Sequence, residues 1–188
     1  YTFTESSCGA QVEGGQENSF ALKIIASNPC GSSSATIEPI QLSSPPSPDF
    51  SIEEPENNCP GAQFTFVNTS TGIKEVFNGM CNEELPARWN ISPGSNGTEW
   101  SLISGTFFDS DELVVRFNQS GTYTISLELN SQACGKGEEQ KTITIQEPPT
   151  AAAVALIQEG IADCTPVTYQ FNNRSTGLGL SYKWTVQP

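Results

Sequence analysis

The fold is decided by Asn58-Cys59-Pro60-Gly61-Ala62-Gln63-Phe64-Thr65-Phe66-Val67-Asn68-Thr69-Ser70-Thr71-Gly72, which returns 105 positions later as Asp163-Cys164-Thr165-Pro166-Val167-Thr168-Tyr169-Gln170-Phe171-Asn172-Asn173-Arg174-Ser175-Thr176-Gly177. A second match joins Ser19–Ala26 to Thr122–Leu129, and each of these segments leads to a Cys-Gly pair, at Cys30 and at Cys134. Self-similarity at a fixed period is the signature of a repeat array. We therefore interpret the 188 residues as part of a tandem array, with units that continue past both ends of the chain.

Apolar and polar residues alternate along most of the chain, and the helical period is nearly absent. This period of two predicts β-strands, and the β-branched and aromatic residues at the apolar positions favour them. We expect strands at 49–53, 63–68, 87–91, 98–103, 112–117, 122–130 and 140–146. The alternation also predicts which side chains fill the core: Phe64, Phe66, Trp89, Tyr123, Ile125 and Leu127.

Two proline-rich segments divide the chain into units. Pro45 and Pro46 mark the first joint, and Pro148 and Pro149 mark the second. Proline fixes φ and removes a donor, so both joints are expected to be stiff, extended connectors. The period fits a β-sandwich of about 100 residues. We expect an all-β chain of tandem immunoglobulin-like sandwiches, with these parts: 1–44, the C-terminal half of a unit; 45–148, a complete unit; 149–188, the N-terminal half of a third unit.

The outer parts are expected to repeat elements of the complete unit. Tyr1-Thr2-Phe3 parallels Val115-Arg116-Phe117, and the final part should hold the first three strands of its unit, including one around Trp184. The units differ at one place, because 17 positions separate Gly72 from Trp89 and only 7 separate Gly177 from Trp184. This insertion contains Cys81. It is either a tolerated surface loop or a place where the sandwich has acquired a function.

Composition restricts the class of protein. Six cysteines without a C-x-x-C pair, and no histidine, argue against a zinc site and favour disulfides in an oxidising, extracellular compartment. Eight basic residues against 21 acidic ones give a net charge of −13, which excludes nucleic acid and disfavours anionic membranes. No apolar run is long enough to span a bilayer, so we expect no membrane insertion. Without histidine there is no Ser-His-Asp or Cys-His constellation, and we expect no enzymatic activity.

Two groups of residues are candidate sites, each with a plain structural alternative. Asp109, Asp111 and Glu112 form an acidic cluster with oxygen ligands suited to Ca²⁺, but the sequence lacks a full calcium-loop pattern, which favours a solvated turn. No other cofactor is expected. The aromatic residues Trp100, Phe107 and Phe108 are candidate surface contacts, for example with sugar rings. For Trp100 the alternative is a half-buried position on a strand. For Phe107 and Phe108 the alternative is a bulge or an inter-unit contact, because adjacent residues of a regular strand face opposite ways and cannot both point inward.

The cysteines are constrained by sandwich geometry. Cys59 precedes the second strand of its unit and Cys134 follows the sixth, which separates them by some 20 Å, since strands rise ~3.3 Å per residue. Disulfide Cα atoms lie within about 7 Å of each other, so this pair is not expected. Cys81 should lie at the same end as Cys134, and we favour a Cys81–Cys134 bridge. Cys8 lies at an end that faces the next unit, so Cys8–Cys81 or Cys8–Cys134 would staple the joint. Cys59 and Cys164 face following units and could bridge to cysteines there.

The chain resembles polycystic-kidney-disease (PKD) and PKD-like domains over essentially its whole length. The family pattern contains Asn-x-Ser after an alternating strand, a tryptophan strand, Gly-x-Tyr-x-Ile-x-Leu and a closing Asn-x-Cys-Gly. These motifs occur here as Asn68-Thr69-Ser70, Arg88-Trp89-Asn90-Ile91, Gly121-Thr122-Tyr123-Thr124-Ile125-Ser126-Leu127 and Asn28-Pro29-Cys30-Gly31. The family's acidic turn after the tryptophan is replaced by Ser92-Pro93-Gly94, so ligands associated with that turn are not carried over.

This resemblance extends to segments of long surface proteins of Bacteroidota, including gliding-motility adhesins exported by the type 9 secretion system. It implies a structural and adhesive stalk or filament at the cell surface. The implied partners are neighbouring repeats of the same chain, surface polysaccharide, and other cell-surface or secretion-system proteins. The alternative from another class is a substrate-binding accessory module of a secreted polysaccharide- or protein-degrading enzyme, which an exposed patch of Trp100 with Phe107 or Phe108 would favour.

Overall fold

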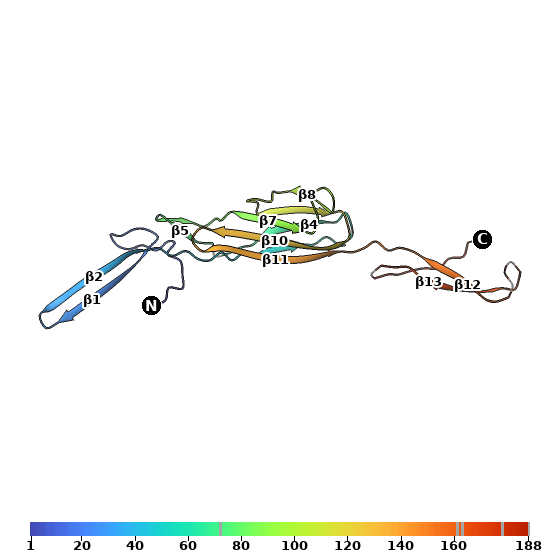
Figure 1. Cartoon of the computed structure of the whole chain (residues 1–188), viewed down its shortest axis with the longest axis horizontal. Coiled ribbons are helices and arrows are strands. Elements are labelled where there is room, and N and C mark those ends of the chain that lie inside the picture. The colour runs from blue at the N-terminus through green and yellow to red at the C-terminus, as the bar shows by residue number, and fades with distance from the viewer. Residues whose placement is uncertain (72, 161, 163, 178, 188) are drawn as a thin grey trace.

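The computed structural model describes residues 1–71, 73–160, 162, 164–177 and 179–187. Its regular elements are strands, arranged as three parts along one long axis (Figure 1). A hairpin lies at one end, two packed sheets lie in the middle, and a second hairpin lies at the other end. The expectation of an all-β chain built from antiparallel sheets is therefore confirmed.

The central part is a pair of antiparallel sheets that packs as a β-sandwich. One sheet has the order β3-β4-β9-β8, formed by Phe50–Glu53, Gln63–Asn68, Glu112–Phe117 and Trp100–Ser104. The other has the order β7-β10-β11, formed by Ala87–Ser92, Gly121–Ser131 and Gly135–Ile145. All seven predicted strands are present, and 63–68 and 112–117 match to the residue. The last strand begins at Gly135 and not near 140, because the long antiparallel ladder of β10 and β11 runs to their turn.

The core of the central part lies between the two sheets. All six side chains predicted for it are buried, and Phe64, Phe66, Ile125 and Leu127 are 0 % exposed. Phe50 of the first sheet meets Trp89 of the second edge-to-face, with ring centroids 5.2 Å apart. Such aromatic pairs add about 1 kcal/mol beyond the area that they bury. Period-two alternation on strands from both sheets therefore produces one continuous apolar interior.

The insertion folds into a further hairpin that strand periodicity did not predict. Its strands are β5 (Glu75–Phe77) and β6 (Met80–Asn82), and Phe77 pairs with Met80 across a two-residue turn. Asn78 and Gly79 both have positive φ, at 50° and 78°. This is the turn type that Asn-Gly favours, because its twist matches that of the flanking strands.

The outer parts are two-stranded hairpins. At the N-terminal end, β1 (Phe20–Asn28) pairs with β2 (Gly31–Ile40), and at the C-terminal end β12 (Ala153–Glu159) pairs with β13 (Thr168–Asn173). The expected third strand around Trp184 is wrong for the described residues, as is strand structure at Tyr1–Phe3. Neither segment has a ladder partner, and a strand needs one to satisfy its backbone groups. Trp184 is correspondingly 51 % exposed.

The outer hairpins nevertheless repeat aromatic contacts of the central part. Phe171 and Trp184 have ring centroids 5.9 Å apart, and Phe66 and Trp89, their matches in the alignment of repeats, are 6.5 Å apart. At the other end of the chain, Phe3 stacks on Phe20 at 5.2 Å. The matching central pair is Phe117 with Tyr123, at 4.6 Å. Similar sequence has therefore produced similar packing in parts that are far apart in the chain.

The Asn-x-Ser motif is also built twice in the same way. The amide of Ser70 donates to the side-chain oxygen of Asn68 at 3.0 Å, and that of Ser175 donates to Asn173 at 2.9 Å. Each serine hydroxyl then hydrogen-bonds the backbone of the preceding strand, at Asp49 or at Ala152. Asparagine and serine favour such local turns because their short side chains reach nearby amides. The motif therefore closes the ends of β4 and β13 in the same way.

Candidate functional site: a cross-linked joint between units

A disulfide joins the N-terminal part to the central part. It links Cys8 to Cys81, with Cα atoms 5.3 Å apart and a sequence separation of 73. The favoured pairing of Cys81 with Cys134 is therefore wrong, and the alternative Cys8–Cys81 staple is confirmed. Cys134 carries an exposed free thiol. Both Cys81 and Cys134 lie near the joint, but the loop that carries Cys8 reaches the β5–β6 hairpin and takes Cys81.

The loop at 8–18 is shaped so that it meets the inserted hairpin. Asn18 has a positive φ of 53° and accepts a hydrogen bond from Gly9 at 2.7 Å, which closes the loop on itself. Its side-chain amide donates to the backbone oxygen of Gly79 at 2.8 Å, across the joint. Ser7, which is fully buried, anchors the base of the loop through Leu42 and Asn18. The loop is thus joined to the hairpin by the disulfide and by the Asn18–Gly79 hydrogen bond.

The first proline-rich linker is bound to the same hairpin. The amide of Ser44 donates to the backbone oxygen of Lys74 at 2.8 Å, and the Ser43 hydroxyl accepts from the amide of Val76 at 2.9 Å. One backbone bond and one side-chain bond thus hold the linker beside β5. The insertion therefore holds both the loop at 8–18 and the linker, so it fixes the entry of the chain into the central part.

The inner side of the hairpin is fastened to the central part through Glu75. This side chain is only 6 % exposed, and it accepts hydrogen bonds from the Ser131 hydroxyl at 2.8 Å and the Ala133 amide at 3.0 Å. These hydrogen bonds lower the pKa of Glu75 below its ordinary value of 4.5, and the bond from Ala133 has a larger effect than the bond from Ser131. A buried carboxylate is tolerated only with such partners. Ionised Glu75 therefore ties the hairpin to the turn between β10 and β11.

Close packing holds the linker against β11. A Cβ at Gly137 would lie 2.7 Å from the backbone oxygen of Pro46 and 2.8 Å from Cδ of Pro48. Real Cβ atoms do not approach so closely, so glycine is required at this position for the linker to lie where it does. The linker is stiff because of its prolines and fixed because of this contact.

The second joint is built differently. In the ranges that the structure describes, no hydrogen bond joins residues 50–146 to residues 150–187, and residues 147–153 are exposed. The Thr150–Thr176 bridge lies wholly within the C-terminal part. Among the described residues, only the first joint has a hairpin, a disulfide and a bound linker. The two proline-rich joints, which looked alike in sequence, are thus structurally distinct.

The acidic cluster does not form a metal site in the described part of the chain. No group of three His, Cys, Asp or Glu side chains that could hold a metal ion occurs there. Asp109 accepts a hydrogen bond from the Ala87 amide at 3.1 Å, and its own amide donates to the Ala87 oxygen. Glu112 begins β9, opposite Val67. Asp109 and Asp111 line a depression of about 460 Å³, but the structure gives them a role in the turn that leads to β9.

The candidate aromatic patch is not formed at the surface. Trp100 is 5 % exposed and packs edge-to-face on Phe107 at 5.6 Å. Phe108 faces outward, 63 % exposed, beneath the Arg88 guanidinium. The adjacent phenylalanines thus point in opposite directions, as strand geometry requires, while residues 107–109 pair with the edge of β7. Of the three aromatic residues that were candidate surface contacts, only Phe108 is exposed.

The joint contains residues that the sequence reasoning missed: Ser7, Asn18, Ser43 and Glu75. The dipeptide Asn78-Gly79 between Val76-Phe77 and Met80-Cys81 was a readable hairpin signal. Nothing local in the sequence marks the serine and glutamate contacts, because their partners lie 33 to 58 positions away.

No protein-family model, curated protein or solved structure matches this chain. Among the residues that the structure describes, there is no helix with the length and apolar character needed to cross a bilayer.

Proposed function

We propose that this chain is a mechanical segment of an extracellular, non-enzymatic repeat protein, of the stalk or filament kind found in cell-surface adhesins. The observation that carries the proposal is the first joint. A disulfide, a bound linker and an inserted hairpin there connect two units that lie along one axis (Figure 1). A connection of this kind resists bending and separation between units, which is what a projecting rod requires.

The proposal takes the units to be PKD-like, immunoglobulin-type sandwiches at 1–44, 45–148 and 149–188. In support, the strand orders β3-β4-β9-β8 and β7-β10-β11 correspond to the ABED and CFG sheets of that architecture. Tyr123 opens the sixth strand of the central unit, and its hydroxyl donates back to the Gln119 oxygen at 3.0 Å. This hydrogen bond resembles the tyrosine corner of immunoglobulin-type domains and supports the proposal. The repeated aromatic contacts and Asn-x-Ser turns support the same division of the outer parts.

The particular case we favour is an adhesin of the gliding-motility type, exported by the type 9 secretion system of Bacteroidota, and it rests on the sequence resemblance. Its partners would be further repeats, surface polysaccharide, or surface and secretion-system proteins. The competing function, a substrate-binding accessory module of a secreted hydrolase, requires an aromatic platform. Burial of Trp100 and inward packing of Phe107 argue against that platform.

Pulling the chain from its two ends in a single-molecule force experiment tests the mechanical role. While the disulfide is intact, tension cannot extend the 73-residue loop that it closes, which is about 250 Å of contour length. We expect the joint to stay closed until the central unit unfolds. In C8S/C81S we expect an additional step at lower force, before that unfolding. A joint that opens first in both proteins would refute the mechanical role.

A further inference from the structure

The turn at the tip of the inserted hairpin is Asn78-Gly79, a dipeptide with a chemical reactivity of its own. The side-chain amide of asparagine can react with the backbone nitrogen of the next residue. Glycine favours this reaction, because it has no Cβ to shield its nitrogen and its backbone adopts conformations closed to other residues. A second such pair, Asn96-Gly97, precedes β8 and provides a comparison within the same chain.

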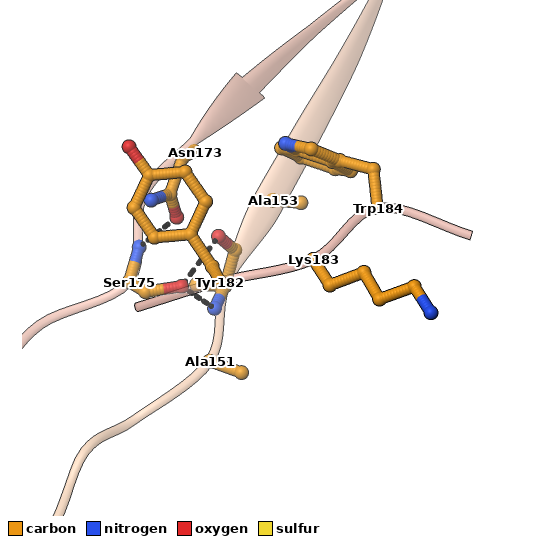
Figure 2. Close-up of a pocket in the computed structure, with 8 residues that line it drawn as sticks. Ala151, Ala153, Asn173, Ser175, Tyr182, Lys183 and Trp184 are labelled. Atoms are coloured by element: carbon orange, nitrogen blue, oxygen red, sulfur yellow. Dashed lines mark hydrogen bonds between the residues drawn. The ribbon is translucent and has the colours of Figure 1, made fainter. Parts of the chain in front are cut away.

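Hydrogen bonds hold both reacting groups of the pair that begins at Asn96. The side-chain oxygen of Asn96 accepts from the Leu102 amide at 3.0 Å, and the Gly97 amide donates to the Trp100 oxygen at 2.7 Å. In the turn drawn in Figure 2, the side-chain oxygen of Asn173 is likewise engaged, by an amide two positions further on. Such bonds have to break before the side-chain carbon of an asparagine can reach the next backbone nitrogen.

The pair that begins at Asn78 is not held in this way. The side chain of Asn78 is exposed, and within the described ranges it neither donates nor accepts a hydrogen bond. The Gly79 amide also donates to no described residue, because the ladder closes on either side of the turn, where Phe77 pairs with Met80. The peptide group between Asn78 and Gly79 can therefore rotate without breaking a bond of the hairpin.

We propose that Asn78 is a site of spontaneous deamidation by water, a modification that loosens the first joint as the protein ages. The Gly79 nitrogen attacks the side-chain carbonyl carbon of Asn78, and the new C–N bond closes a cyclic imide. The side-chain nitrogen takes up the proton of the Gly79 amide and leaves as ammonia. One water molecule then opens either of the two ring C–N bonds at a carbonyl. The products are aspartate and isoaspartate, and in isoaspartate the main chain passes through Cβ.

The isoaspartate product changes the contacts that the hairpin makes at the joint. It lengthens the main chain of a two-residue turn that has positive φ at both positions, 50° and 78°. Such a turn pairs its strands only because its twist matches theirs, so the pairing of Phe77 with Met80 is weakened. The Gly79 oxygen moves away from Asn18, whose side-chain amide donates to it across the joint at 2.8 Å. The modification depends only on the geometry of the turn, and not on adhesion.

Ageing the 188-residue chain in mildly alkaline buffer, followed by digestion and peptide mass spectrometry, tests the site. Deamidation appears as a mass gain of about 1 Da, with separate peaks for the aspartate and isoaspartate peptides. We expect Asn78 to react at least about tenfold faster than Asn96, because two hydrogen bonds must first be broken at Asn96. In urea, where both pairs are unfolded, we expect similar rates. Equal rates in the folded chain, or the same ratio in urea as in the folded chain, would overturn the proposal.

Amide exchange gives a second readout, with Asn78→Gly as the matched control. Gly-Gly suits the positive φ of both turn positions and has no side-chain amide to lose. We expect exchange at residues 76–82 to become faster with age in the parent chain while β10 stays protected, and to stay constant in N78G. No change in the parent, or an equal change in both chains, would overturn the effect on the joint. Freshly prepared protein, in which Asn78 is intact, gives the force response, so this proposal and the mechanical role fail separately.

Discussion

The Cys8–Cys81 bridge should be a large contributor to the stability of the chain. It closes a loop of 73 positions. In the chain-entropy description, closing a loop of that length removes about 4 kcal/mol of conformational freedom from the unfolded chain. The closed loop contains β1, β2, the first linker, β3 and β4, so the constraint acts on part of the central core as well as on the joint. We therefore expect C8S/C81S to lose about 4 kcal/mol of unfolding free energy.

Urea unfolding followed by tryptophan fluorescence measures this loss, because Trp89 and Trp100 are buried in the central core. The control is C59S/C134S, which removes two exposed thiols that form no bridge in the structure. Exposed substitutions of this kind change stability by no more than about 0.5 kcal/mol. A loss below about 1 kcal/mol in C8S/C81S would refute the reasoning. It would mean that the disulfide does not restrict the unfolded chain appreciably, and that hydrogen bonds alone hold the joint.

Three further predictions follow from the joint and the core. Ionised Glu75 stabilises the fold above its unfolded pKa, near 4.5, and this contribution is lost as the pH falls through its lowered folded pKa. The urea midpoint of E75Q should therefore lie below that of the parent at pH 7 and converge with it once the pH falls below the lowered folded pKa of Glu75; a constant gap would contradict this. The indole of Trp89 donates a hydrogen bond, whereas that of Trp100 is buried without a partner. W89F should consequently lose about 1 kcal/mol more unfolding free energy than W100F, and the reverse order would exclude the explanation. Gly137→Ala should displace the linker at Pro46, which would appear as faster amide exchange in the linker with the central core unchanged.

The sequence predicted the central sandwich well because its strands alternate strictly. Leu113, Val115 and Phe117 on β9 face inward at every second position and are all 0 % exposed, and the same period places Phe64 and Phe66. Where one face of a strand is buried, the alternation of apolar and polar residues fixes the pairing register of that strand. The pattern weakens outside that core: the segment around Trp184 has the expected residues but no ladder partner, so it does not form a strand.

The candidate site was less predictable, and the cysteines show why. Strand order and spacing placed Cys81 and Cys134 at the same end of the unit, which favoured pairing them. The actual partner, Cys8, arrives from the preceding part on a loop shaped by Asn18. A disulfide requires Cα atoms within about 7 Å, and sequence spacing does not fix distances between separately folded elements.

What the sequence alone determined is therefore the repeat, the all-β class and the composition of the core, because each depends on residues that recur at short or fixed intervals. The tertiary structure alone decided the joint. Cys8 and Cys81, Ser43 and Val76, and Glu75 and Ala133 are brought together only when the inserted hairpin folds between the linker and the turn of β10 and β11. Contacts between distant segments depend on how whole elements pack, and no local pattern in the chain encodes that packing.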